Sequence, residues 1–253
     1  LSEYGQETGK TITPFVLPIV FAEAENSNGL LKVLIYLGCV MLFCNAPFLN
    51  NQKPYMILRC KRKGWYLGEN MYLWLAAFIY MLFISLVSLI AVLPTVSTNR
   101  LWGEIAGDFV VNQRSLIPVY TWGLVMPVRV IQNYYPLAAF IYTFITGWLS
   151  IVFIGKLMYL LNLKIGKKTI GISAAVFFIM LDPVAVYFTN FKQYGLLYVS
   201  PINWSSLENI NTVSGYPHLS GEYMFIMYVI LIGVESLLSY ICSIKMDIEI
   251  KIV

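Results

Sequence analysis

The chain has 253 residues, of which 58% are hydrophobic and only 12% are charged. Because soluble globular proteins carry roughly 25% charged residues, this composition excludes an ordinary water-soluble enzyme. The net charge of +4 says little about partners until it is mapped along the chain, and no nucleic-acid partner is expected from it.

Apolar segments of about the length that crosses a membrane recur along the chain. A helix of ~20 residues spans the ~30 Å hydrocarbon core of a bilayer. Five segments meet this length: 30–49, 72–94, 137–155, 169–190 and 223–244. Because helices satisfy their own backbone hydrogen bonds in lipid, the sequence predicts an all-α integral membrane protein. We expect a polytopic helix bundle that forms a single transmembrane domain over residues 1–253.

Lysine and arginine are unevenly distributed between the two sides of these spans. Eleven lie on one side: Lys53, Arg59, Lys61, Arg62, Lys63, Lys156, Lys164, Lys167, Lys168, Lys245 and Lys251. Six lie on the other side, over a longer stretch of sequence: Lys10, Lys32 at the edge of a span, Arg100, Arg114, Arg129 and Lys192. The positive-inside rule makes the denser side cytoplasmic. We therefore expect a multi-pass protein of the cell membrane with a cytoplasmic C-terminus.

Five spans and a cytoplasmic C-terminus place residue 1 on the outer side, and the sequence starts with Leu1 rather than Met. We expect one further span upstream, which gives six in total. A cleaved leader, which leaves five, is the alternative. Within the outer segment 1–29, residues 12–22 are apolar but too short and too interrupted by proline to span. They predict an interfacial or re-entrant piece on the outer face.

Residues that carry metal or catalytic chemistry are scarce. The one histidine, His218, has no cysteine or second histidine at ligand spacing. The segment 5–11 resembles a phosphate-binding loop, but three residues rather than four separate Gly5 from Gly9. The four cysteines form no pair on the oxidising side, so free thiols are expected. The sequence predicts no catalytic residue, no metal site and no cofactor in this chain.

The loop 50–71 is the most informative connection. Pro54 is placed to begin a short helix in which apolar and basic residues occupy different faces. Trp65 and Tyr66 mark the headgroup level at which the next span begins. The pattern predicts a short amphipathic helix on the cytoplasmic face. This helix either anchors the chain to anionic lipid or docks a soluble partner, and the pattern leaves both open.

Two spans contain a carboxylate, which is costly in a bilayer unless it faces protein or water. Counted from the cytoplasmic ends of the spans, Asp182 lies ~20 Å and Glu235 ~14 Å inside, which predicts a similar depth and a shared translocation path or pocket. Asp182 has a second interpretation, because Asp followed by Pro183 suits the start of a helix and predicts a helix break. For Glu235, hydrogen bonding to Ser236, Ser239 or a neighbouring helix competes with a functional role.

Six inferred spans, a basic cytoplasmic helix between the second and third, and an apolar outer segment after the first resemble the permease subunit of ABC-2-type ABC transporters, especially the small Gram-positive ones. The stretch 200–207, Ser-Pro-Ile-Asn-Trp-Ser-Ser-Leu, is similar to a recurrent phrase in that group. The resemblance covers nearly the whole chain, but the first span and its amphipathic lead-in have no match here. It implies a location in a bacterial plasma membrane.

The resemblance also implies a mechanism. The short helix would be the coupling helix, seated in a separate ATPase subunit that is present in two copies and binds ATP and Mg. A second permease, the same or similar, completes the assembly. The residues implied to form the coupling loop are Lys53, Pro54, Tyr55, Arg59, Lys61, Arg62 and Lys63. The implied function is export of an amphipathic peptide, antibiotic or lipid. The alternative is a non-transporting membrane anchor or sensor for a cytoplasmic partner.

Overall fold

The computed structural model describes residues 1–22, 30–47, 53–97, 101–111, 126–189, 194–210 and 219–245. These residues form helices and turns, and the only strand-like pairings among them are isolated β-bridges. The α-helices are α1 (Ser2–Thr8), α2 (Leu17–Val20), α3 (Leu30–Phe43), α4 (Lys53–Val92), α5 (Glu104–Val111), α7 (Val128–Asn133), α8 (Pro136–Ile165), α9 (Lys168–Thr189) and α10 (Gly221–Lys245). The 3₁₀ helices are η1 (Leu93–Thr95), η2 (Gly195–Tyr198), η3 (Asn203–Ser205) and η4 (Leu207–Asn209).

Four of these helices, α4, α8, α9 and α10, are long and apolar enough to cross a membrane. The prediction of helices with the length and apolar composition of membrane spans is confirmed for these four. Helix α3 differs, because its 14 residues extend only about 21 Å at the α-helical rise. The span predicted at 30–49 is thus a helix that ends at Phe43 and is shorter than a bilayer core.

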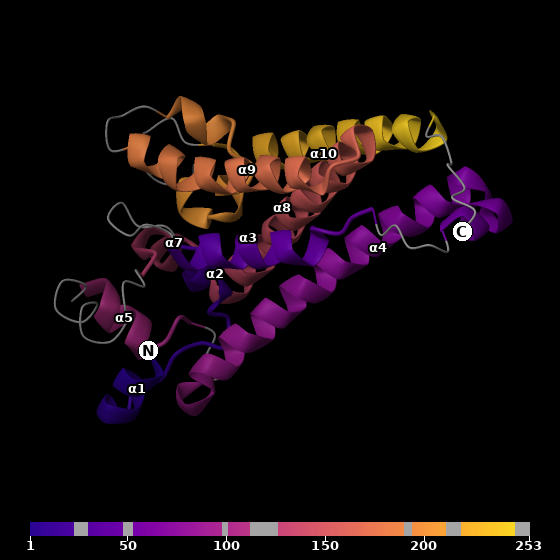
Figure 1. Cartoon of the computed structure of the whole chain (residues 1–253). Helices are drawn as coiled ribbons and strands as arrows, with labels where there is room; N and C mark the ends of the chain where they lie inside the picture. The colour runs from indigo at the N-terminus through magenta and orange to yellow at the C-terminus, as the bar shows by residue number, and fades with distance from the viewer. Residues whose placement is uncertain are drawn as a thin grey trace.

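Helix α8 is the centre of the bundle and packs against α3, α4, α9 and α10. Small residues make this possible, because Ala139, Thr143, Gly147 and Ser150 recur at helical spacing and are all buried. A Cβ added to Gly147 would lie 2.7 Å from a side-chain carbon of Met81 in α4. In Figure 1, α4 crosses the bundle and diverges from α9 and α10 toward one end, where α2 and α7 lie between them.

Two helices extend well beyond their predicted spans. Helix α4 already begins at Lys53, so most of the predicted loop 50–71 is helical, with a break at Lys61 (φ 60°, ψ 163°). Helix α8 continues to Ile165 and includes Lys156, which is buried. The assignment of Lys156 to a cytoplasmic loop was therefore wrong. The helix closes at Gly166, whose positive φ of 74° glycine adopts without steric cost.

The end of the bundle that carries α1, α5 and α7, here called the cap end, lies on the left of Figure 1. Ile12 forms isolated β-bridges with Val96 and Gly103. Gly103 has a φ of 89°, and a Cβ there would lie 2.5 Å from the carbonyl oxygen of Thr11, so this crossing requires glycine. Within the predicted outer piece 12–22, the side chains of Ile12 and Phe21 are fully buried, and α2 packs on α8 and α4. This piece is thus part of the protein core, and its predicted place at the outer face of the membrane stays a prediction.

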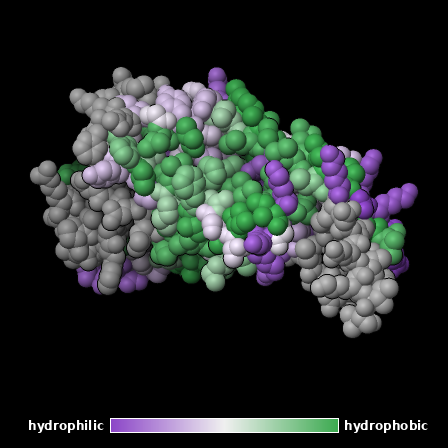
Figure 2. Space-filling view, turned by 45° about the horizontal axis from the view of Figure 1, so that its top comes forward, coloured by the Kyte–Doolittle hydropathy of each residue, from purple (hydrophilic) through white to green (hydrophobic). Residues whose placement is uncertain are grey.

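The opposite end, here called the basic end, comprises the start of α4, the turn between α8 and α9, and the end of α10. Its exposed cations are Arg59, Lys61, Lys63, Lys164, Lys167, Lys168 and Lys245. Figure 2 shows hydrophobic side chains through the middle of the molecule and projecting hydrophilic side chains near one end. The exposed apolar residues of α4 include Leu75, Ile79, Phe83, Leu86 and Ile90. An apolar middle with a charged end is the surface that a bilayer requires.

Candidate functional site

A buried ion pair joins two helices in the core of the bundle. The Lys32 ammonium of α3 lies 3.1 Å from both carboxylate oxygens of Asp182 in α9. The two side chains are 0% and 2% exposed. Each charge is thus compensated by the other, which a buried ion requires. Lys32, which the sequence placed at the edge of a span, is part of the core.

The ion pair overturns the helix break predicted at Asp182. Helix α9 is continuous from Lys168 to Thr189, with Pro183 inside it. The Asp182 carboxylate contacts Lys32 of another helix instead of capping the helix at Pro183. Proline inside a membrane-spanning helix is tolerated when neighbouring groups satisfy the freed backbone, so the dipeptide did not require a break.

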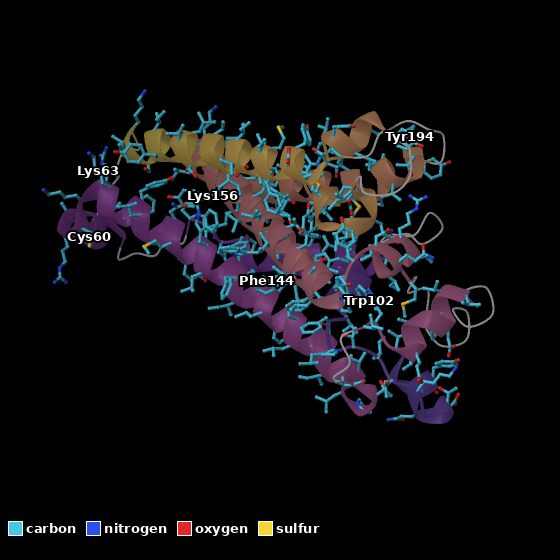
Figure 3. All side chains as sticks on the ribbon, turned by 180° about the vertical axis from the view of Figure 1, so that it is seen from behind. Cys60, Lys63, Trp102, Phe144, Lys156 and Tyr194 are labelled. Carbon is cyan, nitrogen blue, oxygen red and sulfur yellow. The ribbon has the colours of Figure 1, made fainter. Side chains whose placement is uncertain are left out.

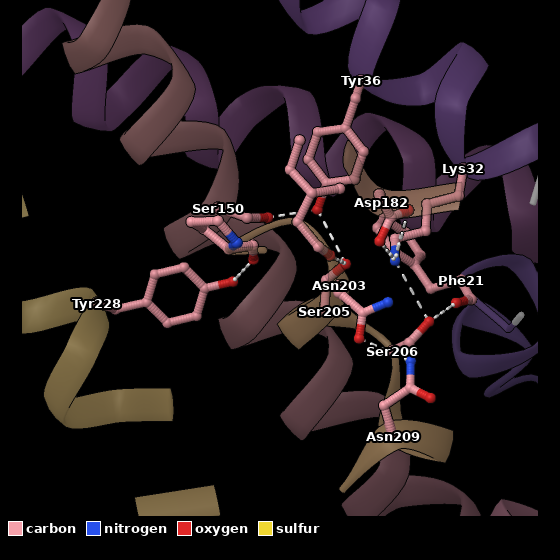
Figure 4. A network of polar contacts seen from close by, with 12 residues as sticks. Phe21, Lys32, Tyr36, Ser150, Asp182, Asn203, Ser205, Ser206, Asn209 and Tyr228 are labelled. Atoms are coloured by element: carbon pink, nitrogen blue, oxygen red, sulfur yellow. Dashed lines mark hydrogen bonds and ion pairs between the residues drawn. The ribbon is translucent and has the colours of Figure 1, made fainter. Parts of the chain in front are cut away.

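A hydrogen-bonded network extends from the ion pair (Figure 4). The Lys32 ammonium also donates to Ser206 Oγ at 3.5 Å, and the Ser206 hydroxyl donates to the carbonyl oxygen of Phe21. One turn along α3 from Lys32, the Tyr36 hydroxyl donates to Ser205 Oγ at 3.0 Å and contacts Ser150 Oγ of α8. The network connects α2, α3, α8 and α9 to the segment 203–206 and pairs most of the polar groups that it buries.

The segment 200–207 enters the bundle instead of lying on its surface. Ser200, Asn203, Ser205 and Ser206 are completely buried, and Trp204 is 1% exposed. The Trp204 indole donates to the carbonyl oxygen of Leu197 at 2.8 Å, and its ring packs edge-on against Tyr228 of α10. The Tyr228 hydroxyl in turn donates to the carbonyl oxygen of Pro201 at 2.6 Å. Sequence reasoning singled out this phrase by its resemblance to a family and did not predict its burial.

A second polar cluster lies where α4, α8 and α10 meet. The Lys156 ammonium of α8 donates to Asn70 Oδ1 of α4 at 2.5 Å and to Ser236 Oγ of α10 at 2.6 Å. Glu235 of α10 lies beside it, and Lys156 is the charge that acts on its carboxyl group. Both carboxyl oxygens of Glu235 are buried and accept no hydrogen bond. Figure 3 places Lys156 inside the bundle, between α8 and its neighbours.

The two predicted carboxylates therefore do not share one cluster. Asp182 belongs to the network that includes Ser150, and Glu235 to the cluster that includes Lys156. Lys156 lies six positions after Ser150 in α8, which corresponds to about 9 Å along the helix axis. The single pocket expected from equal depth is replaced by two polar layers at successive levels of α8.

The basic residues proposed for a coupling loop have different surroundings. Arg59, Lys61 and Lys63 are exposed, and Figure 3 shows Cys60 and Lys63 projecting from the start of α4. The Arg62 guanidinium instead donates to the carbonyl oxygen of Ile244 in the last turn of α10. Arg62 thus joins two helix ends within the chain. Lys53, Pro54 and Tyr55 lie in the first turn of α4, and their side chains fall outside the described residues.

Trp65 and Tyr66, expected at the headgroup level, are buried inside the protein, each with 6% exposure. The Tyr66 hydroxyl donates to the carbonyl oxygen of Ser236 at 2.8 Å, and its ring packs against Tyr240. Tyr66 thus joins α4 to α10, and both aromatic side chains face the protein interior.

The cap end contains an exposed counterpart of the buried ion pair. The Asp108 carboxylate of α5 accepts a hydrogen bond from the Tyr4 hydroxyl at 2.9 Å and from the Lys10 ammonium. The hydrogen bond from Lys10 lowers the pKa of Asp108. The same carboxylate raises the pKa of Lys10 and that of Tyr4. Partial exposure of both members, 37% for Lys10 and 24% for Asp108, makes this pair weak.

Within the described ranges, no group of three or more His, Cys, Asp or Glu residues is placed to hold a metal ion. The four cysteines, Cys39, Cys44, Cys60 and Cys242, are free thiols. His218 lies outside the described residues.

Comparison with protein-family models gives no match for this chain, and neither do comparisons with curated proteins and with solved structures. The fold and the polar clusters described above therefore carry the functional argument.

Proposed function

We propose that this chain is the membrane-spanning permease subunit of an ATP-driven exporter of the ABC-2 type, which moves an amphipathic peptide, antibiotic or lipid. A separate ATPase subunit, present in two copies, binds ATP and Mg and hydrolyses the ATP. A second permease, the same or similar, completes the assembly. The chain sits in the bacterial plasma membrane with the basic end in the cytoplasm.

The observation that carries this proposal is the first part of α4, residues 53–60. It is helical, it is separated from the long apolar part of α4 by the break at Lys61, and its exposed Arg59 lies near exposed Lys61 and Lys63. A short basic helix at a bundle end offers a rigid element through which a partner that opens and closes can move the bundle. The break at Lys61 allows this helix to take its own direction relative to α4.

The buried polar layers favour transport over the alternative of a simple anchor. Charged groups within membrane-spanning helices are costly, and they mark pathways or functional contacts more often than anchoring segments. Here two lysines and two carboxylates are buried: Lys32, Lys156, Asp182 and Glu235. A simple anchor for a cytoplasmic partner does not require such groups. A bundle that changes its packing during transport can use them, because polar contacts can exchange partners.

The test is ATP hydrolysis by the full-length protein purified in detergent with its co-purifying partners. We compare wild type with Arg59→Glu/Lys63→Glu, which reverses two exposed charges, because Arg62 has a structural contact with α10. Lys164→Glu/Lys167→Glu is the matched control, since both lysines are exposed at the turn between α8 and α9. ATPase activity that co-purifies, is lost in the first variant and is kept in the control supports the proposal. A chain that brings no ATPase with it leaves the anchor or sensor as the better function.

A further inference from the structure

Glu235 differs from Lys32, Lys156 and Asp182, the other buried charged residues of the bundle, in having no hydrogen-bond partner among the described residues. Its residue is 6% exposed, and neither carboxyl oxygen accepts a hydrogen bond. Asp182, at a similar degree of burial, is held by an ammonium group at 3.1 Å. Buried carboxylates are normally paired or hydrogen-bonded, so the open acceptors of Glu235 point to a ligand that supplies positive charge.

Donors are close to Glu235, but each is engaged elsewhere. The Lys156 ammonium is bonded to Asn70 and Ser236. The hydroxyl of Ser236 donates to the carbonyl oxygen of Ile232, and that of Ser239 donates to the carbonyl oxygen of Ser236. Within the part of the chain that the structure describes, no donor therefore pairs with the Glu235 carboxyl group.

The surroundings select the kind of ligand. Helix α10 packs against α8 and α4. The titratable groups that these helices bring to the junction are Lys156 and Tyr159 from α8, and Tyr66 and Glu69 from α4. Lys156 is the cation of this set, and it opposes the binding of any further cation beside it, a proton included. Burial without a hydrogen-bond partner acts in the other direction and favours the neutral carboxyl group. A proton needs no coordination shell and neutralises the carboxyl group without displacing Lys156.

We propose that Glu235 is a proton-binding site in the core of the bundle. In the arrangement described here the carboxyl group holds the proton, and Lys156 bridges α4 and α10 through Asn70 and Ser236. When the proton leaves to water at the basic end, the O–H bond electrons stay on the carboxylate, and the Lys156 ammonium exchanges Asn70 for Glu235. Proton release thus loosens the contact between α8 and α4.

The consequence reaches the part of α4 that follows the break at Lys61. Asn70 lies nine residues beyond this break, about 14 Å along the helix axis. A change in the contact of Asn70 therefore acts on the helix that carries Lys63 and adjoins the segment 53–60. The proton site itself does not depend on transport, so it stands or falls independently of the exporter proposal.

Infrared difference spectroscopy tests the site directly, because a protonated carboxylic acid has a C=O stretch that a carboxylate lacks. We use the full chain reconstituted in lipid nanodiscs and titrate pH. We expect a protonated-acid band at neutral pH that shifts in D₂O, disappears at alkaline pH and is absent in Glu235→Gln. Glu222→Gln is the matched control, because Glu222 is an exposed carboxylate in the first turn of the same helix, and it should retain the band.

Thermal unfolding of the same variants provides a second readout. Glu235→Gln is isosteric with the protonated acid, so its melting temperature at neutral pH should match that of wild type. If Glu235 were instead a carboxylate that pairs with Lys156, Glu235→Gln would leave a buried ammonium without its counter-ion and lower the melting temperature strongly. Absence of the infrared band at neutral pH, or a large fall in melting temperature for Glu235→Gln, overturns the proposal.

Discussion

Replacing Lys32 by methionine should destabilise the protein severely. The side chains of Lys32 and Asp182 are 0% and 2% exposed, and both carboxylate oxygens lie 3.1 Å from the ammonium group. Lys32→Met keeps the length of the side chain but leaves the Asp182 carboxylate buried without a counter-ion. Breaking a buried pair in this way costs about 3–5 kcal/mol. For a chain of this size, 1 kcal/mol corresponds to about 2–4 °C in melting temperature, so the fall amounts to roughly 10 °C.

The assay is thermal unfolding in detergent, followed by tryptophan fluorescence on samples that remain monodisperse in gel filtration. The double variant Lys32→Met/Asp182→Asn removes both charges and should recover much of the loss, because no uncompensated ion remains. Lys10→Met is the matched control, since the ion pair of Lys10 with Asp108 is partly exposed and its loss should change the melting temperature little. Equal effects of Lys32→Met and Lys10→Met, or a double variant as unstable as the single one, would refute the reasoning.

Three further predictions follow from packing and charge. A Cβ at Gly171 would lie 2.2 Å from Asn162 Oδ1, so Gly171→Ala should lower the free energy of unfolding by about 1–3 kcal/mol. Gly233→Ala is the control and should be neutral or stabilising, because a Cβ there has nothing within 4 Å. A lower melting temperature for Gly233→Ala than for Gly171→Ala contradicts this prediction. Trp204→Ala should lower the free energy of unfolding by about 3–5 kcal/mol, because the indole is buried in the bundle. Thermal unfolding measures this change as well. A decrease below about 1 kcal/mol would show that the segment 200–207 is not held in the core. Asp108, whose pKa is lowered, stabilises the fold above its ordinary pKa of 3.8 and loses this effect as the pH falls through the lowered value. The gap in melting temperature between wild type and Asp108→Asn should therefore narrow on acidification, and a gap that stays constant with pH contradicts it.

The long helices were predictable because hydropathy reports length directly. The uninterrupted apolar run 72–94 identified α4, and the run 137–155 identified α8. Their polar extensions were not predictable in the same way, since a helix that leaves the hydrocarbon region carries the same residues as a loop. Lys156 was assigned to a loop for this reason, although it lies nine residues before the end of α8 at Ile165.

The polar interior was less accessible to sequence reasoning. Lys32 and Asp182 are 150 positions apart, and no spacing rule links residues at such a distance. The two charges lowered the apolar character of two different spans, and each was interpreted alone. A pairing of one unexplained cation with one unexplained anion would have been a useful signal, because an isolated buried ion is disfavoured. The segment 200–207 gave no such signal, because its burial depends on partners contributed by α3, α8 and α10.

The span of sequence within the Lys32–Asp182 pair has a consequence for biosynthesis. Ribosomes add about 5–20 residues per second, so the 150 positions between the two residues take about 8–30 s to synthesise. During this interval Lys32 has no counter-ion, and α3 is too short to settle across lipid alone. Helix α3 therefore reaches its final position only after α9 has emerged, and Ser206, 174 positions after Lys32, joins later still. The final packing of the N-terminal part of the membrane domain therefore requires residues from its C-terminal part.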